Sequence, residues 1–179
     1  MATIKADLFN LKELQNKILQ YKKSLEYKAE LAVTKLIQMG YDVALSKIQE
    51  SPLGKTIVLK SAITPEQAGC KAMLLAIGQV VDVPGREPFS LLMAVEFGAG
   101  IHYNPKNEGE NPKAPEFGFG VGTYPGQKFA LNEDGWWFQN EDGEWVHTFG
   151  VKATMPMYNA HKVIRDNYTN VFKEVFKIV

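Results

Sequence analysis

Three features of this 179-residue chain predict an α+β fold. Apolar residues recur every three or four positions near both ends, which is typical of amphipathic helices. The middle holds short apolar segments separated by glycine and proline turns, which is typical of strands. Strand and helix signals do not alternate along the chain, as they would for a parallel sheet. The sequence therefore predicts a single domain, 1–179, with helices at both ends and a small antiparallel sheet between them.

The first helix is predicted over 10–51. Its apolar face comprises Leu11, Leu14, Ile18, Tyr21, Leu25, Ala29, Ala32, Leu36, Met39 and Val43. Asn10 and Glu13 resemble a capping box at its start, and Ser51-Pro52 ends it because the residue before proline disfavours the helical region. One long helix and two helices broken near Tyr21–Leu25 both fit. An unbroken helix would be about 60 Å long, which is longer than a small domain is wide, so part of its apolar face would remain exposed for contact with another chain. A coiled coil is a further interpretation.

The sheet region is predicted over 55–150. Lys55–Ala62 and Lys71–Val83 have strand character, with a turn at Thr64–Gly69 between them and Gly78 as a candidate bulge. A second turn is predicted at Pro84–Pro88.

Phe89–Phe97 is apolar and fits either a short buried helix or a strand. The stretch 98–126 contains seven glycines and four prolines and is predicted to be a long loop. Loops of this length inside a domain are uncommon and are usually functional. Residues 135–149 predict a tryptophan-rich β-hairpin with a four-residue loop at Asn140–Gly143. The last helix is predicted over 153–177, with Pro156 in its first turn.

Charge is balanced overall but divided along the chain. Lys and Arg number 20, as do Asp and Glu, so a generally basic protein that coats nucleic acid is excluded. Residues 1–60 carry a net charge of +4, 61–150 carry −7 and 151–179 carry +3. This division favours head-to-tail packing, in which a basic surface of one subunit meets an acidic surface of the next.

The sequence offers no recognisable cofactor or metal site. The histidines His102, His147 and His161 lack a second ligand at metal spacing, and Gly118–Gly122 lacks the lysine and hydroxyl of a phosphate loop. Cys70 is alone and is expected to be a half-buried thiol. No secretion signal or membrane span is evident, so synthesis in the cytosol is expected.

Carboxylates gather near the tryptophans and suggest one enzyme hypothesis. Glu133, Asp134 or Glu144 could serve a carbohydrate-active hydrolase, in which paired carboxylates flank a sugar stacked on aromatic rings. Glu141 and Asp142 lie at the predicted turn tip, where solvent disfavours the shielded environment of a general acid. A charged hairpin tip that resists edge pairing is the simpler interpretation.

Four segments in order resemble one protein family. They are Ala94–Gly100 (AVEFGAG), Gly122–Gln127 (GTYPGQ), Gly135–Phe138 (GWWF), and Thr148–Gly150 (TFG) leading to Ala153–Ala160 (ATMPMYNA). This series resembles the tailed-bacteriophage neck family, the lambdoid gene-product-ten-like head–tail connector or tail-completion proteins. The likeness covers Leu11 to the C-terminus. Ala99 replaces the family's commoner threonine, and Met157 stands where phenylalanine or methionine is expected.

The resemblance implies a structural virion protein rather than an enzyme. It implies a sixfold ring in the neck, assembled in the bacterial host cytoplasm, that binds copies of itself and other connector, tail-terminator or tail-tube proteins. It implies no membrane contact and at most passive contact with DNA in the lumen. No catalytic, cofactor-binding or metal residue is carried over from the family. The loop 98–126 and the tryptophan hairpin are the candidate partner contacts. A phage-encoded binding module remains a third hypothesis.

Overall fold

The computed structural model describes residues 8–66, 69–82, 88–100, 134–139 and 142–177. It confirms the α+β class: a long N-terminal helix and a C-terminal helix accompany short antiparallel strands. Within the described residues, the strands form four separate two-stranded pairs rather than one larger sheet.

Helix α1 spans Leu8–Gln49 without a break, so the alternative of two helices is wrong. It begins before Asn10, so the predicted capping box does not mark its start. A cap contributes only about 1 kcal/mol, too little to fix a boundary when the preceding residues also adopt helical geometry. The C-terminal end agrees with the proline signal: the N–H of Ser51 bonds to the carbonyl of Ile48 at 3.1 Å, and a single 3₁₀ turn, η1 (Gly54–Thr56), follows.

Strands β1 (Ile57–Glu66) and β2 (Gly69–Gly78) form a long antiparallel hairpin, paired from Ile57↔Gly78 to Glu66↔Gly69. The turn predicted over Thr64–Gly69 contains this reversal but is too wide, because Thr64–Glu66 belong to β1 and Gly69 begins β2. Both strands of a two-stranded ladder are edges, which tolerate Pro65 within a strand.

Gly78 ends β2 rather than bulging from it. A Cβ built on Gly78 would lie 2.5 Å from the Cβ of Leu92, so the glycine permits close approach of the following helix. Beyond it, β3 (Val80–Val81) pairs with β4 (Phe89–Ser90).

The apolar segment before the long loop is a helix, α2 (Leu91–Phe97). Directly after it, β5 (Ala99–Gly100) pairs with β8 (Gly150–Val151), so the first residues of the predicted loop are ordered into a ladder. Gly98 and Gly100 have φ values of 80° and 68°, as expected for a sharp exit from this segment. The remainder of the loop prediction, 101–126, lies outside the described residues.

The tryptophan hairpin is confirmed as β6 (Trp136–Gln139) and β7 (Trp145–Thr148), paired antiparallel. Helix α3 spans Pro156–Phe176 and starts three residues later than predicted. Met155 adopts the left-handed conformation (φ 52°), which ends the preceding extended segment and places Pro156 at the first helical position.

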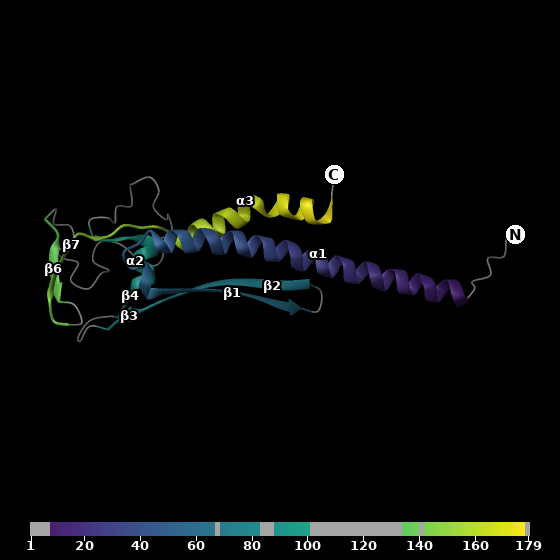
Figure 1. Cartoon of the computed structure of the whole chain (residues 1–179), viewed down its shortest axis with the longest axis horizontal. Coiled ribbons are helices and arrows are strands. Elements are labelled where there is room, and N and C mark those ends of the chain that lie inside the picture. Colours follow the sequence, from purple (N-terminus) through teal and green to yellow (C-terminus); the bar gives the residue numbers. More distant parts are fainter. Residues whose placement is uncertain (1–7, 67–68, 83–87, 101–133, 140–141, 178–179) are drawn as a thin grey trace.

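Figure 1 shows that α1 lies between α3 on one side and the β1–β2 hairpin on the other, with α3 antiparallel to α1. On the α3 side, Ala32, Leu36 and Val171 are buried together. On the hairpin side, Ile48, Ile57 and Val95 form a second core cluster. The two helices approach closely at Gly40, where a Cβ would lie 2.6 Å from Cδ1 of Ile164. The N-terminal half of α1 extends beyond both layers (Figure 1).

Candidate functional site

Two of the segments that resemble the phage neck family are in direct contact: the first, Ala94–Gly100, and the last, Ala153–Ala160. Glu96 of α2 is only 6% exposed, and its carboxylate faces the first turn of α3. Oε2 accepts a hydrogen bond from the N–H of Met157 and Oε1 accepts one from the N–H of Tyr158, both at 2.9 Å. These N–H groups have no partner within a helix, and the positive end of the helix dipole favours a carboxylate there.

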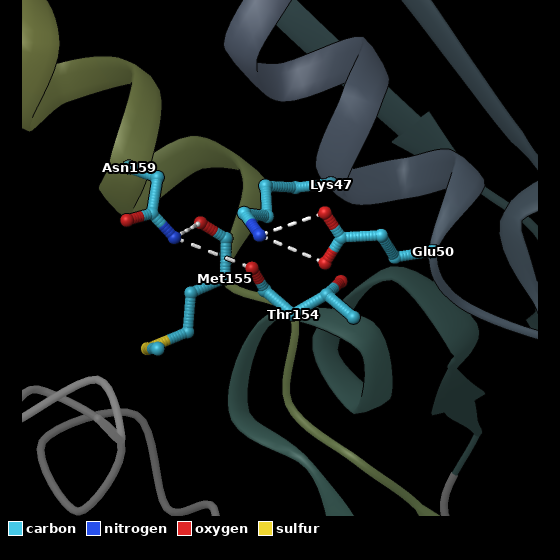
Figure 2. Close-up of polar contacts among 5 residues, drawn as sticks. All are labelled: Lys47, Glu50, Thr154, Met155 and Asn159. Atoms are coloured by element: carbon cyan, nitrogen blue, oxygen red, sulfur yellow. Dashed lines mark hydrogen bonds and ion pairs between the residues drawn. The ribbon is translucent and has the colours of Figure 1, made fainter. Parts of the chain in front are cut away.

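The chain entering α3 is held by the same helix. The carbonyl of Val95 accepts hydrogen bonds from the N–H groups of Thr154 (2.9 Å) and Met155 (3.4 Å). The side-chain amide of Asn159 donates to the carbonyls of Met155 (2.8 Å) and Thr154 (3.3 Å), which holds the left-handed Met155 in place. Figure 2 shows these amide bonds. It also shows the ion pair in which Lys47 Nζ lies 2.8 Å from Glu50 Oε1 near the end of α1.

The β5–β8 ladder completes this contact. Gly150 has a φ of 102°, and a Cβ at this position would lie 2.1 Å from the carbonyl oxygen of Ala99. Only glycine allows the two backbones to approach this closely. Helix α2 is therefore joined to the segment at the start of α3 by three contacts, which involve the Glu96 carboxylate, the Val95 carbonyl and the ladder at Gly150. Their role is structural.

Sequence reasoning missed the role of Glu96. The signal was present, since Glu96 is the single charged residue in the apolar run Phe89–Phe97. A lone carboxylate in a buried segment needs a partner. Its partner is two backbone N–H groups about sixty residues away, which carry no side-chain signature.

The described carboxylates of the hydrolase hypothesis are not shielded from solvent. Asp134 and Glu144 are both exposed to solvent, and Glu133 and Glu141 lie outside the described residues. Asp142, at the hairpin tip, is exposed as expected. This environment is unlike the water-poor one that general acids use.

Two tryptophans of the hairpin, Trp137 and Trp145, are exposed instead of packed in the core. Trp137 is 62% exposed and Trp145 65%. The ring of His147 lies 4.9 Å from that of Trp137 and 4.9 Å, edge-on, from that of Phe149. Nε2 of His147 donates to the carbonyl of Asp134 at 2.7 Å, which fixes the ring at the base of the hairpin.

A second exposed apolar surface lies on α1. Every residue from 11 to 27 is exposed, and the first fully buried residue is Ala32. We call Leu11, Leu14, Ile18, Tyr21 and Leu25 the N-terminal stripe, because their spacing places them on one side of the helix. A contiguous exposed apolar surface of this kind marks an interaction site more often than scattered single residues do.

Within the described residues, the remaining candidates assemble no site. Cys70 is half-buried, as expected, and His161 is exposed, whereas His102 and 118–122 lie outside the described residues. Among the residues that the structure describes, no three His, Cys, Asp or Glu side chains are grouped closely enough to hold a metal ion. None of the described helices is apolar over a long enough stretch to cross a membrane.

An open groove lies between α1 and α3. Lys35, Asp42 and Glu174 are among the residues that line it. Nζ of Lys35 donates to Oε1 of Glu174 at 2.6 Å, and Asp42 accepts from Gln38 at 2.8 Å. The Lys35–Glu174 pair links the two helices, whereas the bond between Gln38 and Asp42 lies within α1.

The chain has no match among protein-family models, curated proteins or solved structures.

Proposed function

We propose that this protein is a structural subunit of a tailed-phage virion and forms a ring that joins head to tail at the neck. The resemblance to the neck family implies that the ring is sixfold. Such a subunit needs neither a catalytic residue nor a cofactor. It binds copies of itself and neighbouring connector, tail-terminator or tail-tube proteins, contacts DNA at most passively in the lumen, and assembles in the host cytoplasm without a membrane.

The observation that carries the proposal is the exposure of large apolar side chains at two separate places, the N-terminal stripe and the tryptophan hairpin. A ring subunit buries a surface against each of its two neighbours, so it needs two such places.

The contact between the family-like segments adds support. Glu96 belongs to the first segment, and Met157 and Tyr158 belong to the last. Their spacing in the sequence is thus tied to a single buried contact. Proteins that share this fold would keep the two segments, because the segments form this contact together.

The test is the composition of tailed particles from a bacterium that carries the coding sequence. We expect mass spectrometry to find the chain in purified particles at a fixed copy number. We expect electron-microscopy averages to place it in the neck with sixfold symmetry. Deleting the gene should leave separate heads and tails, and a plasmid copy should restore joined particles.

Joined particles that lack the chain would refute the proposal. So would recovery of the chain only with host proteins, outside particles, which is the outcome that the binding-module hypothesis predicts.

A further inference from the structure

The N-terminal stripe continues the surface by which α1 contacts α3. Ala32 and Leu36 of α1 pack with Val171 of α3, and the stripe extends the same three-four spacing toward the N-terminus. Helix α3 ends at Phe176, whose ring centroid lies 5.9 Å from Nζ of Lys28. Beyond this point α1 keeps its apolar side but has no covering element among the described residues (Figure 1).

Lysines border the stripe on both sides. At 100° per residue, Lys17 and Lys28 fall along one edge and Lys22 along the other. Lys17 pairs with Glu13 at 2.8 Å and Lys22 with Glu26 at 3.7 Å, and both glutamates lie farther round the helix from the stripe. Two stripes facing each other would bring like charges together, as at the flanking positions of a mismatched coiled coil. The charge pattern favours an acidic partner.

The tryptophan hairpin is complementary to the stripe, because it combines exposed aromatic side chains with acidic residues. Trp137 pairs with His147, and Trp145 lies two residues before His147, so the three side chains share one side of the ladder. Phe149 extends this side through its ring contact with His147. We call these four residues the aromatic face. The stretch 134–148 contains four acidic residues and no lysine or arginine.

We propose that the aromatic face of one subunit binds the N-terminal stripe of the next copy of this chain. The two surfaces lie at opposite ends of the elongated molecule (Figure 1). A contact between unlike surfaces is heterologous and propagates from subunit to subunit, and it closes into a ring when the rotation allows. The inference deepens the proposed function, because it names the surfaces through which the ring forms.

The test mixes two variants that each lack one surface. Leu14→Gln with Ile18→Gln removes the stripe, and Trp137→Thr with Trp145→Thr removes the aromatic face; all four side chains are exposed. Each variant alone is expected to be monomeric, with self-association weakened at least about tenfold, as for interface anchors. An equimolar mixture should form a one-to-one dimer and nothing larger, since each partner retains one surface. Native mass spectrometry resolves all three species.

The matched control carries Leu19→Gln with Tyr27→Gln, two exposed apolar residues of α1 outside the stripe. This variant should assemble like the original chain. Circular dichroism verifies that every variant is folded. If a double variant is not folded, Ile18→Gln and Trp145→Thr singly serve in the same mixing test.

Three outcomes would overturn the contact. They are an original chain that is monomeric at all concentrations, a mixture that stays monomeric, and an aromatic-face variant that still dimerises alone through α1. These outcomes concern the contact only. If the chain is nevertheless found in particle necks, the neck role stands and a different surface forms the ring.

Discussion

The carboxylate of Glu96 accepts a hydrogen bond from the backbone N–H of Tyr158, at 2.9 Å, across 62 positions of sequence. A second bond, from Met157, uses its other oxygen. An isolated buried carboxylate is costly, and so are unpaired N–H groups at a buried helix end. The hydrogen bonds satisfy both the carboxylate and the N–H groups, so neither carries the free-energy cost of burial without a partner. The contact therefore fixes where α3 begins relative to α2.

Replacing Glu96 should destabilise the fold well beyond an average surface change. Glu96→Ala leaves two N–H groups without the carboxylate, for a loss of about 3 kcal/mol in the free energy of unfolding. Glu96→Gln keeps one acceptor oxygen and should lose about half as much. Urea denaturation measures both. The control, Glu50→Ala, breaks an exposed ion pair and should change stability by less than about 1 kcal/mol. Equal effects at the two glutamates would contradict a buried cap.

Gly150→Ala should disrupt the β5–β8 ladder. The new Cβ would lie 2.1 Å from the carbonyl oxygen of Ala99, which is backbone and cannot move aside. Gly143→Ala is the matched control, since Gly143 also has positive φ (79°) but nothing within 4 Å of its Cβ. The control should lose about 1–2 kcal/mol from the left-handed conformation alone. Gly150→Ala should lose clearly more, as judged by thermal unfolding. A loss no greater than the control's would show that the backbones can separate.

The same leucine-to-alanine change should affect stability very differently at two positions of α1. Leu36 is 8% exposed in the contact with α3, whereas Leu14 is 54% exposed. Leu36→Ala should cost about 2–4 kcal/mol through a cavity. Leu14→Ala should change the stability of the monomer by less than about 0.5 kcal/mol. Urea titrations at low protein concentration, where self-association is minimal, measure both. A large loss at Leu14 under those conditions would mean that another part of the chain covers it.

Removing residues 1–22 should separate folding from assembly. The side chains of residues 11–22 are all exposed, so their removal should change the melting temperature of the monomer little. Most of the stripe would be lost, so multi-angle light scattering should show a monomer where the full chain forms larger species. An oligomer that persists after truncation would place the self-association surface elsewhere.

Assembly should weaken as salt rises. The first 60 residues carry a net charge of +4 and residues 61–150 carry −7, so a contact between these regions of neighbouring subunits would be electrostatically favourable. Raising NaCl to about 1 M shortens the screening length to about 3 Å and removes most of this attraction. Light scattering across a salt series tests it, and a size distribution indifferent to ionic strength would argue for a purely apolar interface.

Local patterns predicted most of the elements, because local physics determines them. The three-four spacing identified α1 and α3, and the turn between the tryptophan strands identified β6 and β7. Strand limits around Thr64 and Gly78 were wrong because pairing, rather than propensity, decides how far a strand extends.

The contacts that join distant segments could not be predicted in the same way. The partners of Glu96 are backbone groups that every residue carries, and the need for glycine at position 150 arises from the position of Ala99. The helical form of Leu91–Phe97 likewise depends on which side of the segment packs into the core cluster around Val95. Tertiary packing decides each of these features.

The part of α1 that extends beyond α3 can turn a small tilt of the helix into a large displacement of its end. From Lys28 to Leu8 the helix runs about 30 Å, at 1.5 Å per residue, beyond the end of α3. A tilt of about 10° at its base would displace its tip by about 5 Å while leaving the core undisturbed, because the helix is stiff over this length. In the proposed ring, subunits joined through this part of α1 would follow a change in the ring diameter by tilting the helix, without repacking their interiors.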